Sequence, residues 1–355
     1  MNRVKRLKGV ITERRQRLDA FDEIVIEHPR FDDIAKRTLL LIEDTEARMK
    51  QNERKKIAAG KRSFKRKELW VLPIIGPSGS TKSTSMEHIV DEIGSLPGLG
   101  DDDVPIQIVT LDENTRNTKQ LQVQILEAFE DPGAETLAAT VQYNADRVND
   151  KIRKIAENKR TRVLVLDEAG NMLAHAGLQV AKQMAKAIKG LVNKGIFSVI
   201  LMGTDEVQTL FNVDKELQSR NCGTIDLNRF DIKWAPDRKY FFTFVADFEK
   251  RLVKDKIIDR PIDLVGTVEG RAMVYDFANG IIGLVPRILR IAVDRTLTAG
   301  RGHVEWEDIA SAFHVWNLSL DKKDRHYDPF GESGPNKETL RFIREDSKPG
   351  RQQAA

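Results

Sequence analysis

Three stretches of the chain are apolar, uninterrupted by any charged residue, and each has the length of a β-strand: residues 69–75, 163–166 and 196–202. Such runs, without polar alternation, are typical of strands buried on both faces, as in a parallel sheet covered by helices. Residues 104–111 alternate and predict a further strand. Apolar positions at helical spacing predict helices over 83–96, 120–129, 137–159 and 179–192. This order of elements predicts an α/β fold with a parallel sheet.

A different pattern follows the last strand. Aromatic and aliphatic residues recur at helical spacing between 234 and 253, namely Tyr240, Phe241, Phe244, Val245, Phe248 and Leu252. We interpret this stripe as the core of a helical subdomain, with further helices over 262–279, 285–297 and 304–313. The predicted organisation is a helical, basic extension (1–68), an α/β core (69–232), a helical subdomain (233–318) and a disordered or partner-binding tail (319–355).

Composition narrows the class of protein. The 355 residues are 40% hydrophobic and 32% charged, and 58 basic against 54 acidic residues give a net charge of +4. The apolar runs are far shorter than the ~20 residues that span a bilayer, so a soluble, cytoplasmic protein without a membrane partner is expected. Cys222 is the single cysteine, which excludes an internal disulfide and a cysteine-cluster metal site.

The basic charge is concentrated before the first strand. Between Arg48 and Lys67 there are ten basic residues and one acid, Glu53. Such a block attracts nucleic-acid phosphates, but a solvated helix end followed by a linker explains it equally well.

The segment after the first apolar run reads Gly76-Pro77-Ser78-Gly79-Ser80-Thr81-Lys82-Ser83-Thr84. In a phosphate loop, G-x-x-x-x-G-K-[ST], backbone N–H groups surround the β-phosphate, the lysine reaches the outer phosphates and the following hydroxyl holds Mg²⁺. Gly76, Lys82 and Ser83 fit this pattern, whereas Thr81 replaces the glycine before the lysine. The segment predicts a nucleotide site with Ser83 as a Mg²⁺ ligand.

Two carboxylates, Asp167 and Glu168, directly follow the strand at 163–166. Ligands of open α/β sheets bind at the carboxyl ends of the strands, so Asp167 is placed to hold Mg²⁺ and Glu168 to orient or deprotonate the attacking water. The alternative is a pair of acids that merely ends a strand. The phosphate loop upstream favours the catalytic interpretation.

Further polar residues follow in an informative order. Thr204, with Asp205 behind it, closes the strand at 196–202 and is expected beside the γ-phosphate; a helix N-cap is a compatible role for Thr204. Arg220 ends a helix, and Arg287 lies on a helix of the small subdomain. Charge that develops on the γ-phosphate needs cationic help from a neighbouring subunit or from the lid, which gives these arginines a use.

With these motifs the chain resembles the AAA+ ATPases, and among them the transposition regulators of the TniB/TnsC type. The resemblance covers roughly residues 20–318 and depends on the segments 76–84, 163–172, 200–204, 217–220 and 283–287. It implies an AAA+ P-loop core with a C-terminal helical lid. Lys82, Ser83 and Thr84 would belong to Walker A, Asp167 and Glu168 to Walker B. Thr204 would be sensor 1, Arg220 an arginine finger acting in trans, and Arg287 sensor 2.

The same resemblance implies a function. Subunits bound to ATP and Mg²⁺ would form a ring or helical filament on double-stranded DNA, recruit a DDE transposase of the TniA/TnsB type, and work with a target selector of the TniQ type. Hydrolysis would disassemble the filament. The loop 112–119 is the candidate DNA contact, through Arg116, Thr118 and Lys119; the alternative is an ordinary solvated loop.

Thr81 departs from the family pattern. Glycine before the lysine permits φ > 0 and a close approach of the backbone to phosphate, which a β-branched residue disfavours unless Gly79 absorbs the geometry. A working ATPase, a slowly hydrolysing switch and a degenerate scaffold all remain open, and the retained charged motif residues favour slow, stimulated hydrolysis. The competing functions are a helicase loader or initiator-like ATPase and a non-hydrolysing DNA adaptor.

Overall fold

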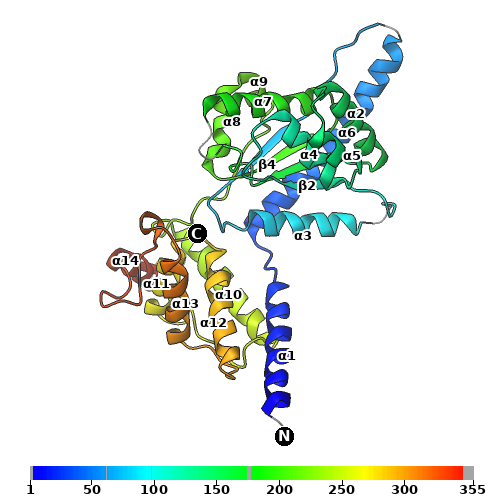
Figure 1. Ribbon diagram of the computed structural model, residues 1–355. Helices are drawn as coiled ribbons and strands as arrows, with labels where there is room; N and C mark the ends of the chain where they lie inside the picture. Colours follow the sequence, from blue (N-terminus) through cyan, green and yellow to red (C-terminus); the bar gives the residue numbers. More distant parts are fainter. Residues whose placement is uncertain (1–2, 61, 97, 174–176, 347–355) are drawn as a thin grey trace. The chain divides into compact units, whose positions relative to one another are not determined.

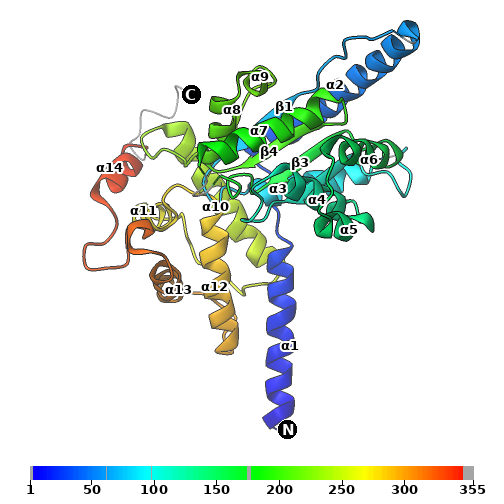
Figure 2. The same cartoon turned by 45° about the horizontal axis from the view of Figure 1, so that its top comes forward.

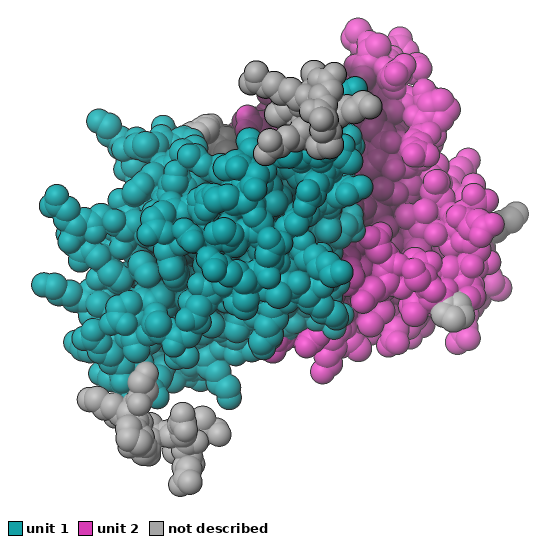
Figure 3. Space-filling model, turned by 90° about the horizontal axis from the view of Figure 1, so that it is seen from below, with its two compact units in different colours: residues 1–28, 229–355 teal, residues 29–228 magenta. Residues whose placement is uncertain are grey.

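The structure is a computed structural model that describes residues 3–60, 62–96, 98–173 and 177–346. The chain divides into two compact units, coloured separately in Figure 3: unit 1 comprises residues 1–28 and 229–355, and unit 2 comprises residues 29–228. The extension predicted as one segment over 1–68 is therefore divided, since residues 1–28 belong with the C-terminal helices and residues 29–68 with the α/β unit.

Unit 2 is built on a five-stranded parallel sheet with the strand order β2-β3-β4-β1-β5. Its strands are β1 (Val71–Ile75), β2 (Ile106–Thr110), β3 (Val163–Asp167), β4 (Ser198–Gly203) and β5 (Ile225–Asp226). The three uninterrupted apolar runs form the three central strands, as predicted. The sheet and its helices confirm the predicted α/β class.

Each central strand sends alternate side chains to opposite faces of the sheet. In β3, Leu164 and Leu166 pack into one hydrophobic cluster, whereas Val163 and Val165 pack into another. Because both faces are covered, both sets of residues must be apolar, and all four are completely buried. This explains why these strands show no polar alternation.

Helices cover both faces of this sheet (Figures 1 and 2). One cluster joins the sheet to α2 (Pro29–Ala59) and α3 (Lys82–Gly94). The other joins it to α4 (Thr118–Ala128), α6 (Ala145–Asn158), α7 (Leu178–Asn193) and α8 (Gln208–Val213). The remaining elements of unit 2 are short: α5 (Gly133–Ala139), η1 (Asp205–Val207) and α9 (Lys215–Gln218).

The single helix predicted over 137–159 is wrong. The chain forms α5 and α6 with an irregular segment between them. Asn144 begins α6, because its side chain accepts hydrogen bonds from the backbone N–H groups of Asp146 and Arg147. Val141, an apparent member of the apolar stripe, lies in the irregular segment and is 97% exposed.

Unit 1 consists of helices around its own core. These are α1 (Arg3–Asp22), α10 (Ala235–Lys254), α11 (Val268–Ala278), α12 (Leu284–Thr298), α13 (Trp306–Leu318), η2 (Lys322–Asp324) and α14 (Lys337–Asp346). Phe241, Phe244 and Phe248 of the predicted aromatic stripe are buried in this core. None of the helices in the described ranges is both long and apolar enough to cross a membrane.

The tail predicted to be disordered or partner-binding contains α14, a helix that packs on α11. Thr339 and Ile343, one turn apart on α14, are 4% and 1% exposed. Asp276 of α11 accepts hydrogen bonds from the backbone N–H of Asn336 (2.6 Å) and the hydroxyl of Thr339 (2.7 Å) at the start of α14. The charged composition of this segment hid an amphipathic helix. The part of the prediction that concerns 347–355 lies outside the described residues.

We predict that Asp276→Ala destabilises unit 1 by about 2 kcal/mol, because two hydrogen-bond donors at the start of α14 lose their buried acceptor. Burial raises the pKa of Asp276 and the two hydrogen bonds oppose that rise, so the carboxylate is held by these donors. Urea unfolding measures the loss, and hydrogen exchange over 337–346 localises it. Asp324→Ala, at an exposed position of η2, is the matched control. Equal losses for both variants would contradict the anchoring role.

Candidate nucleotide site

The loop between β1 and α3 is a tight turn. A Cβ at Gly76 would lie 2.7 Å from Ser80 Oγ and 2.8 Å from the carbonyl oxygen of Leu227, so no larger residue fits there without a shift. Gly79 adopts a positive φ of 83°. Ser78 and Thr84 are exposed, Thr84 in the first turn of α3. The loop has the compact backbone that a phosphate cradle requires.

Lys82 is folded into this loop. Its Nζ donates hydrogen bonds to the carbonyls of Gly76 (2.8 Å) and Pro77 (3.0 Å) and to Ser80 Oγ (3.2 Å), and the residue is 8% exposed. Burial lowers the pKa of Lys82, and the charges of Glu168 and Asp167 oppose that shift. The ammonium group therefore lies inside the loop, where the negative charges of Asp167 and Glu168 stabilise its protonated form.

Ser83 meets the first of those carboxylates. Its hydroxyl donates a 2.6 Å hydrogen bond to Asp167 Oδ2, although 84 residues separate the two. Asp167 ends β3 and is 5% exposed, and its Oδ1 accepts the backbone N–H of Glu168 at 2.8 Å. A hydroxyl beside a carboxylate is a pair of hard oxygen donors of the kind that Mg²⁺ prefers. The donor set fits the predicted metal site.

Glu168 follows with a backbone that non-glycine residues rarely adopt. Its φ is 55°, and its side chain is exposed. The backbone turns immediately afterwards, since Ala169 N donates to Met202 O on β4 (2.8 Å) and Asn171 N to Glu168 O (2.8 Å). Strained backbone of this kind is concentrated at functional sites. The turn leaves the Glu168 carboxylate at the edge of the sheet, in the position expected of a group that meets water.

Thr204 lies beside the same turn. A Cβ at Gly170 would lie 2.7 Å from Thr204 Oγ1, and one at Gly203 would lie 2.8 Å from the Gly170 backbone nitrogen. The Thr204 hydroxyl donates to the carboxylate of Glu206 and makes no capping bond to the backbone of η1, so the predicted N-cap bond is absent. Asp205 is exposed in η1. The end of β4 thus brings a hydroxyl next to the Asp167–Glu168 turn.

Arg220 lies at the other edge of the sheet. Its carbonyl accepts the backbone N–H of Val71, where β1 begins, whereas the phosphate loop follows the end of β1 about 13 Å away. Its guanidinium pairs with Glu68 (2.8 Å) and donates to the carbonyl of Glu216 (2.6 Å), and the side chain is 5% exposed. Arg220 is therefore remote from the loop of its own unit, and a role in trans stays a prediction.

Arg287 belongs to unit 1. It lies in the first turn of α12 and is exposed. Gly283 precedes this helix as its N-cap. A contact between Arg287 and phosphate remains a prediction.

The loop proposed as the DNA contact has its cations engaged within the chain. Arg116 donates to the carbonyl of Met172 (3.0 Å), and Lys119 Nζ donates to the carbonyls of Ala138 (2.9 Å) and Thr140 (2.8 Å). Thr118 is the first residue of α4. These contacts stabilise the fold around α4 and α5. The DNA contact by this loop stays a prediction, and it would require both cations to exchange partners.

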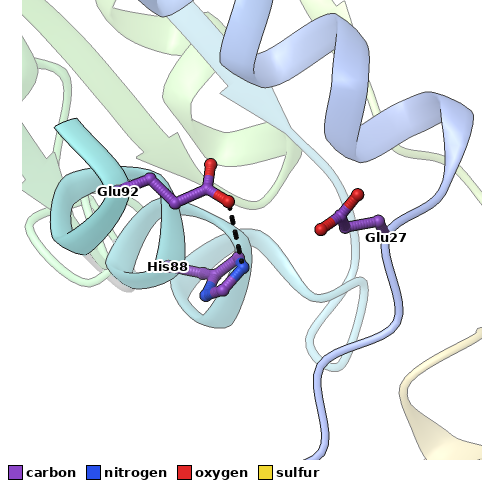
Figure 4. A group of neighbouring side chains, drawn as sticks. All are labelled: Glu27, His88 and Glu92. Carbon is purple, nitrogen blue, oxygen red and sulfur yellow. Dashed lines mark ion pairs between the residues drawn. The ribbon is translucent and has the colours of Figure 1, made fainter. Parts of the chain in front are cut away.

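His88 and Glu92 form a separate polar pair on α3, with 3.5 Å between Nε2 and the carboxylate (Figure 4). They lie four residues apart on the helix surface, where such a pair contributes about 0.3–0.5 kcal/mol when the imidazole is protonated. Glu27, also drawn in Figure 4, belongs to unit 1. We assign the pair a role in helix stability.

Three contributors to these contacts have no signal in the sequence. Glu68 and Glu206 partner Arg220 and Thr204, and Gly170 permits the close approach of Thr204. Glu68 follows the basic block and is 152 residues from Arg220. Only the folded backbone brings Glu68 and Arg220 together, whereas Glu206 lies two residues after Thr204.

A parallel sheet in the order β2-β3-β4-β1-β5, with a phosphate loop after β1 and Asp-Glu at the end of β3, defines an ATPase of the AAA+ P-loop class. The chain belongs to the TniB family: the model for the bacterial TniB protein matches residues 50–230. The matched segment spans both the phosphate loop and Arg220. No curated protein sequence matches the chain.

Solved structures agree with this fold. The Aeropyrum pernix ORC2 protein, solved as ADPNP–ADP complexes, is 12% identical with a TM-score of 0.51, over 79% of this chain and 69% of that chain. The ORC1 protein of the same organism, solved in complex with DNA, is 13% identical with a TM-score of 0.48, over 77% and 65%. The Thermotoga maritima RuvB Holliday junction branch migration motor is 15% identical with a TM-score of 0.38, over 79% and 72%. Of these three, the likeness to the ORC2 protein supports the AAA+ fold of this chain.

Thr81 itself carries the unusual backbone of the loop. Its φ of 67° and ψ of 14° lie in the left-handed region, directly before α3, and Gly79 is at positive φ as well. Gly79 therefore does not absorb the geometry on behalf of Thr81. A left-handed conformation costs an L-residue about 1–2 kcal/mol, and β-branching adds to the strain. Thr81 therefore adopts the left-handed conformation that the glycine of the usual G-x-x-x-x-G-K-[ST] pattern would permit.

We predict that Thr81→Gly stabilises unit 2 by about 1 kcal/mol, because relief of the left-handed strain exceeds the added flexibility of the unfolded chain. Thermal unfolding should show a rise of about 2–4 °C. Thr81→Ala keeps a Cβ but removes the branch, and it should give a smaller gain. A neutral or destabilising Thr81→Gly would show that the hydroxyl or methyl of Thr81 makes a compensating contact.

Proposed function

We propose that this protein is an ATP-dependent switch of DNA transposition, which assembles on double-stranded DNA in the ATP-bound state and disassembles after hydrolysis. The observation that carries the proposal is the contact between Ser83 and Asp167, which joins the phosphate loop to the acidic end of β3. Membership of the TniB family supports the link to transposition. The resemblance to TniB/TnsC regulators supplies the partners: a DDE transposase of the TniA/TnsB type and a target selector of the TniQ type.

The site residues have separate roles in this proposal. Lys82 and the loop backbone would bind the outer phosphates of ATP, and Ser83 with Asp167 would hold Mg²⁺. The bound metal neutralises phosphate charge. Glu168 accepts a proton from the attacking water, and Thr204 orients that water through its hydroxyl. Arg220 of one subunit and Arg287 of the lid supply positive charge to the γ-phosphate.

We infer that hydrolysis is slow until DNA or a partner stimulates it. Thr81 places a β-branched side chain where the backbone must approach phosphate, and Arg220 is held by Glu68. The Thr204 hydroxyl is also engaged with Glu206. Each of these groups must be rearranged or tolerate strain during turnover. A long-lived ATP-bound state suits a protein that marks a DNA site before the transposase arrives.

We predict opposite effects for two substitutions at the site. Lys82→Ala removes the cation that binds the outer phosphates and should abolish ATP-dependent assembly on duplex DNA. Glu168→Gln keeps the binding contacts but removes the proton acceptor, so it should lower the hydrolysis rate by about 10²–10⁴-fold and accumulate ATP-bound assemblies. Negative-stain microscopy and phosphate release measure the two effects. Normal DNA coating by Lys82→Ala, together with no stabilised assembly of Glu168→Gln, would refute the switch.

A subunit-mixing experiment tests the role of Arg220. Arg220→Ala and Lys82→Ala should each be nearly inactive alone. In a mixture, the Lys82→Ala subunit still supplies Arg220 to the intact nucleotide site of an Arg220→Ala neighbour, so part of the ATPase activity should return. Equal mixing of Lys82→Ala with Glu168→Gln is the control, because both lesions lie in the same half-site. Activity that stays at the sum of the two inactive proteins would exclude a shared site.

A further inference from the structure

A pocket of unit 2, of about 380 Å³, lies at the opposite end of β1 from the phosphate loop. It is open to solvent and is lined by α2, by the segment that leads into β1, and by the residues that follow α9. Its walls contain Trp70 and Ser219, and a single carboxylate, Glu68. Its cations, which we call the basic pocket, are Arg48, Lys55, Lys65, Arg66, Lys67 and Arg220.

The charge of the basic pocket is concentrated and largely uncompensated. Six cations face one carboxylate, whereas the whole chain carries a net charge of only +4. Within the described part of the chain, Lys55, Lys65 and Lys67 form no ion pair, and all three are exposed. Arg54, Lys56 and Arg62 are exposed close by in sequence and extend the basic surface. A pocket of this kind attracts an anion with several charges.

The lysines are held in a defined arrangement. Arg48 and Lys55 lie seven residues apart, so they share one face of α2. Lys65 and Lys67 lie on the irregular segment that leads into β1, and both line the pocket. Asn52 fixes this segment to α2, since its side chain donates to the carbonyl of Lys67 (2.9 Å) and accepts the Lys67 backbone N–H (2.6 Å). The cations therefore belong to a fixed surface rather than to a loose linker.

The buried side chain of Arg220 is an independent observation that favours an anion in the pocket. It is 4% exposed and lines the pocket, and its Nε has no hydrogen-bond partner within the described residues. A buried donor without an acceptor is costly, and a neighbouring anion that shifts Arg220 would relieve that cost. The carboxylate of Glu68, 49% exposed in its side chain, balances only one of the surrounding cations.

We propose that the basic pocket binds the phosphate backbone of duplex DNA. Several cations distributed over α2 and the segment that leads into β1 match a row of phosphates better than a single phosphate group. Trp70 does not offer its ring for base stacking on the side covered by Arg48, whose guanidinium lies 4.1 Å from the ring centre. Binding should therefore be independent of sequence. The inference rests on the proposed function, since it assigns residues to its DNA-binding step.

The test compares two triple variants of the full chain. Lys55→Gln, Lys65→Gln and Lys67→Gln remove three pocket cations. Lys154→Gln, Lys182→Gln and Lys186→Gln remove the same charge from exposed positions of α6 and α7. Fluorescence anisotropy measures affinity for a 30-bp duplex of arbitrary sequence across a salt series. Binding of a fluorescent ATP analogue and sedimentation with ATP but no DNA are measured in parallel.

The pocket variant should bind DNA at least about tenfold more weakly than the wild type, and its salt slope should fall by about 0.9 for each lost phosphate contact. The control variant should keep most of the affinity, and both should bind the ATP analogue normally. Equal affinities of the two variants would overturn the assignment while leaving the proposed function intact. Failure of the wild type to bind duplex DNA would refute both. Loss of ATP-dependent self-association without loss of DNA affinity would show instead that the pocket contacts a second copy of the chain.

Discussion

One hydrogen bond, from the backbone N–H of Gly76 to the carbonyl of Gly203 at 3.0 Å, joins the ends of β1 and β4. The site depends on this junction. Gly76 has no room for a side chain against Ser80 and Leu227, and Gly203 has none against Gly170. Because the backbones approach so closely, the phosphate loop, the Asp167–Glu168 turn and Thr204 lie along one edge of the sheet. The positions of the predicted site residues therefore follow from backbone packing before any side-chain contact is made.

The same edge contains two residues in left-handed conformations, Thr81 and Glu168. Glycine and asparagine adopt this conformation with less strain than threonine or glutamate does. Thr81 directly precedes Lys82 of the phosphate loop, and Glu168 directly follows Asp167, the predicted metal ligand. Strain of about 1–3 kcal/mol at each position is maintained only because the surrounding sheet fixes the backbone. The strained conformations of Thr81 and Glu168 lower the stability of unit 2 and fix the backbone geometry of the candidate site.

Much of the fold could be predicted from the sequence because burial on both faces leaves a clear mark. The uninterrupted apolar run at 163–166 predicts the strand β3, and the two carboxylates that follow it predict the carboxyl end of that strand. The boundary between α5 and α6 was missed because a single side chain, Asn144, starts a new helix within a continuous apolar pattern. The docking of α14 was missed because Thr339 and Ile343 are only two buried residues in a charged segment. Periodicity reveals which face is buried, but not where a cap interrupts it or what the face packs against.

For the candidate site, the sequence predicted the local motifs but not their partners. Lys82, Ser83 and Asp167 were recognisable by type and spacing, and the contact between Ser83 and Asp167 agrees with the roles predicted for both. The partner of Arg220, Glu68, comes from elsewhere in the fold, whereas the partner of Thr204, Glu206, lies two residues further along the chain, and neither acid belongs to a motif. Spacing along the chain contains no information on contacts that are made through the sheet. Whether Arg220 and Arg287 reach a phosphate depends on a neighbouring subunit or on unit 1, which no motif describes.

Glu68 connects the basic pocket with Arg220, because it lines the pocket and also pairs with the Arg220 guanidinium. A DNA phosphate in the pocket would compete with Glu68 for the same guanidinium. Because the side chain of Glu68 is 49% exposed, water screens its ion pair with Arg220, so a DNA phosphate can compete for the guanidinium. Arg220 would then break its ion pair with Glu68 only when a DNA phosphate replaces that carboxylate. DNA binding in the pocket would therefore change the contacts of Arg220. Through this arginine, DNA binding would influence the hydrolysis that a neighbouring subunit performs.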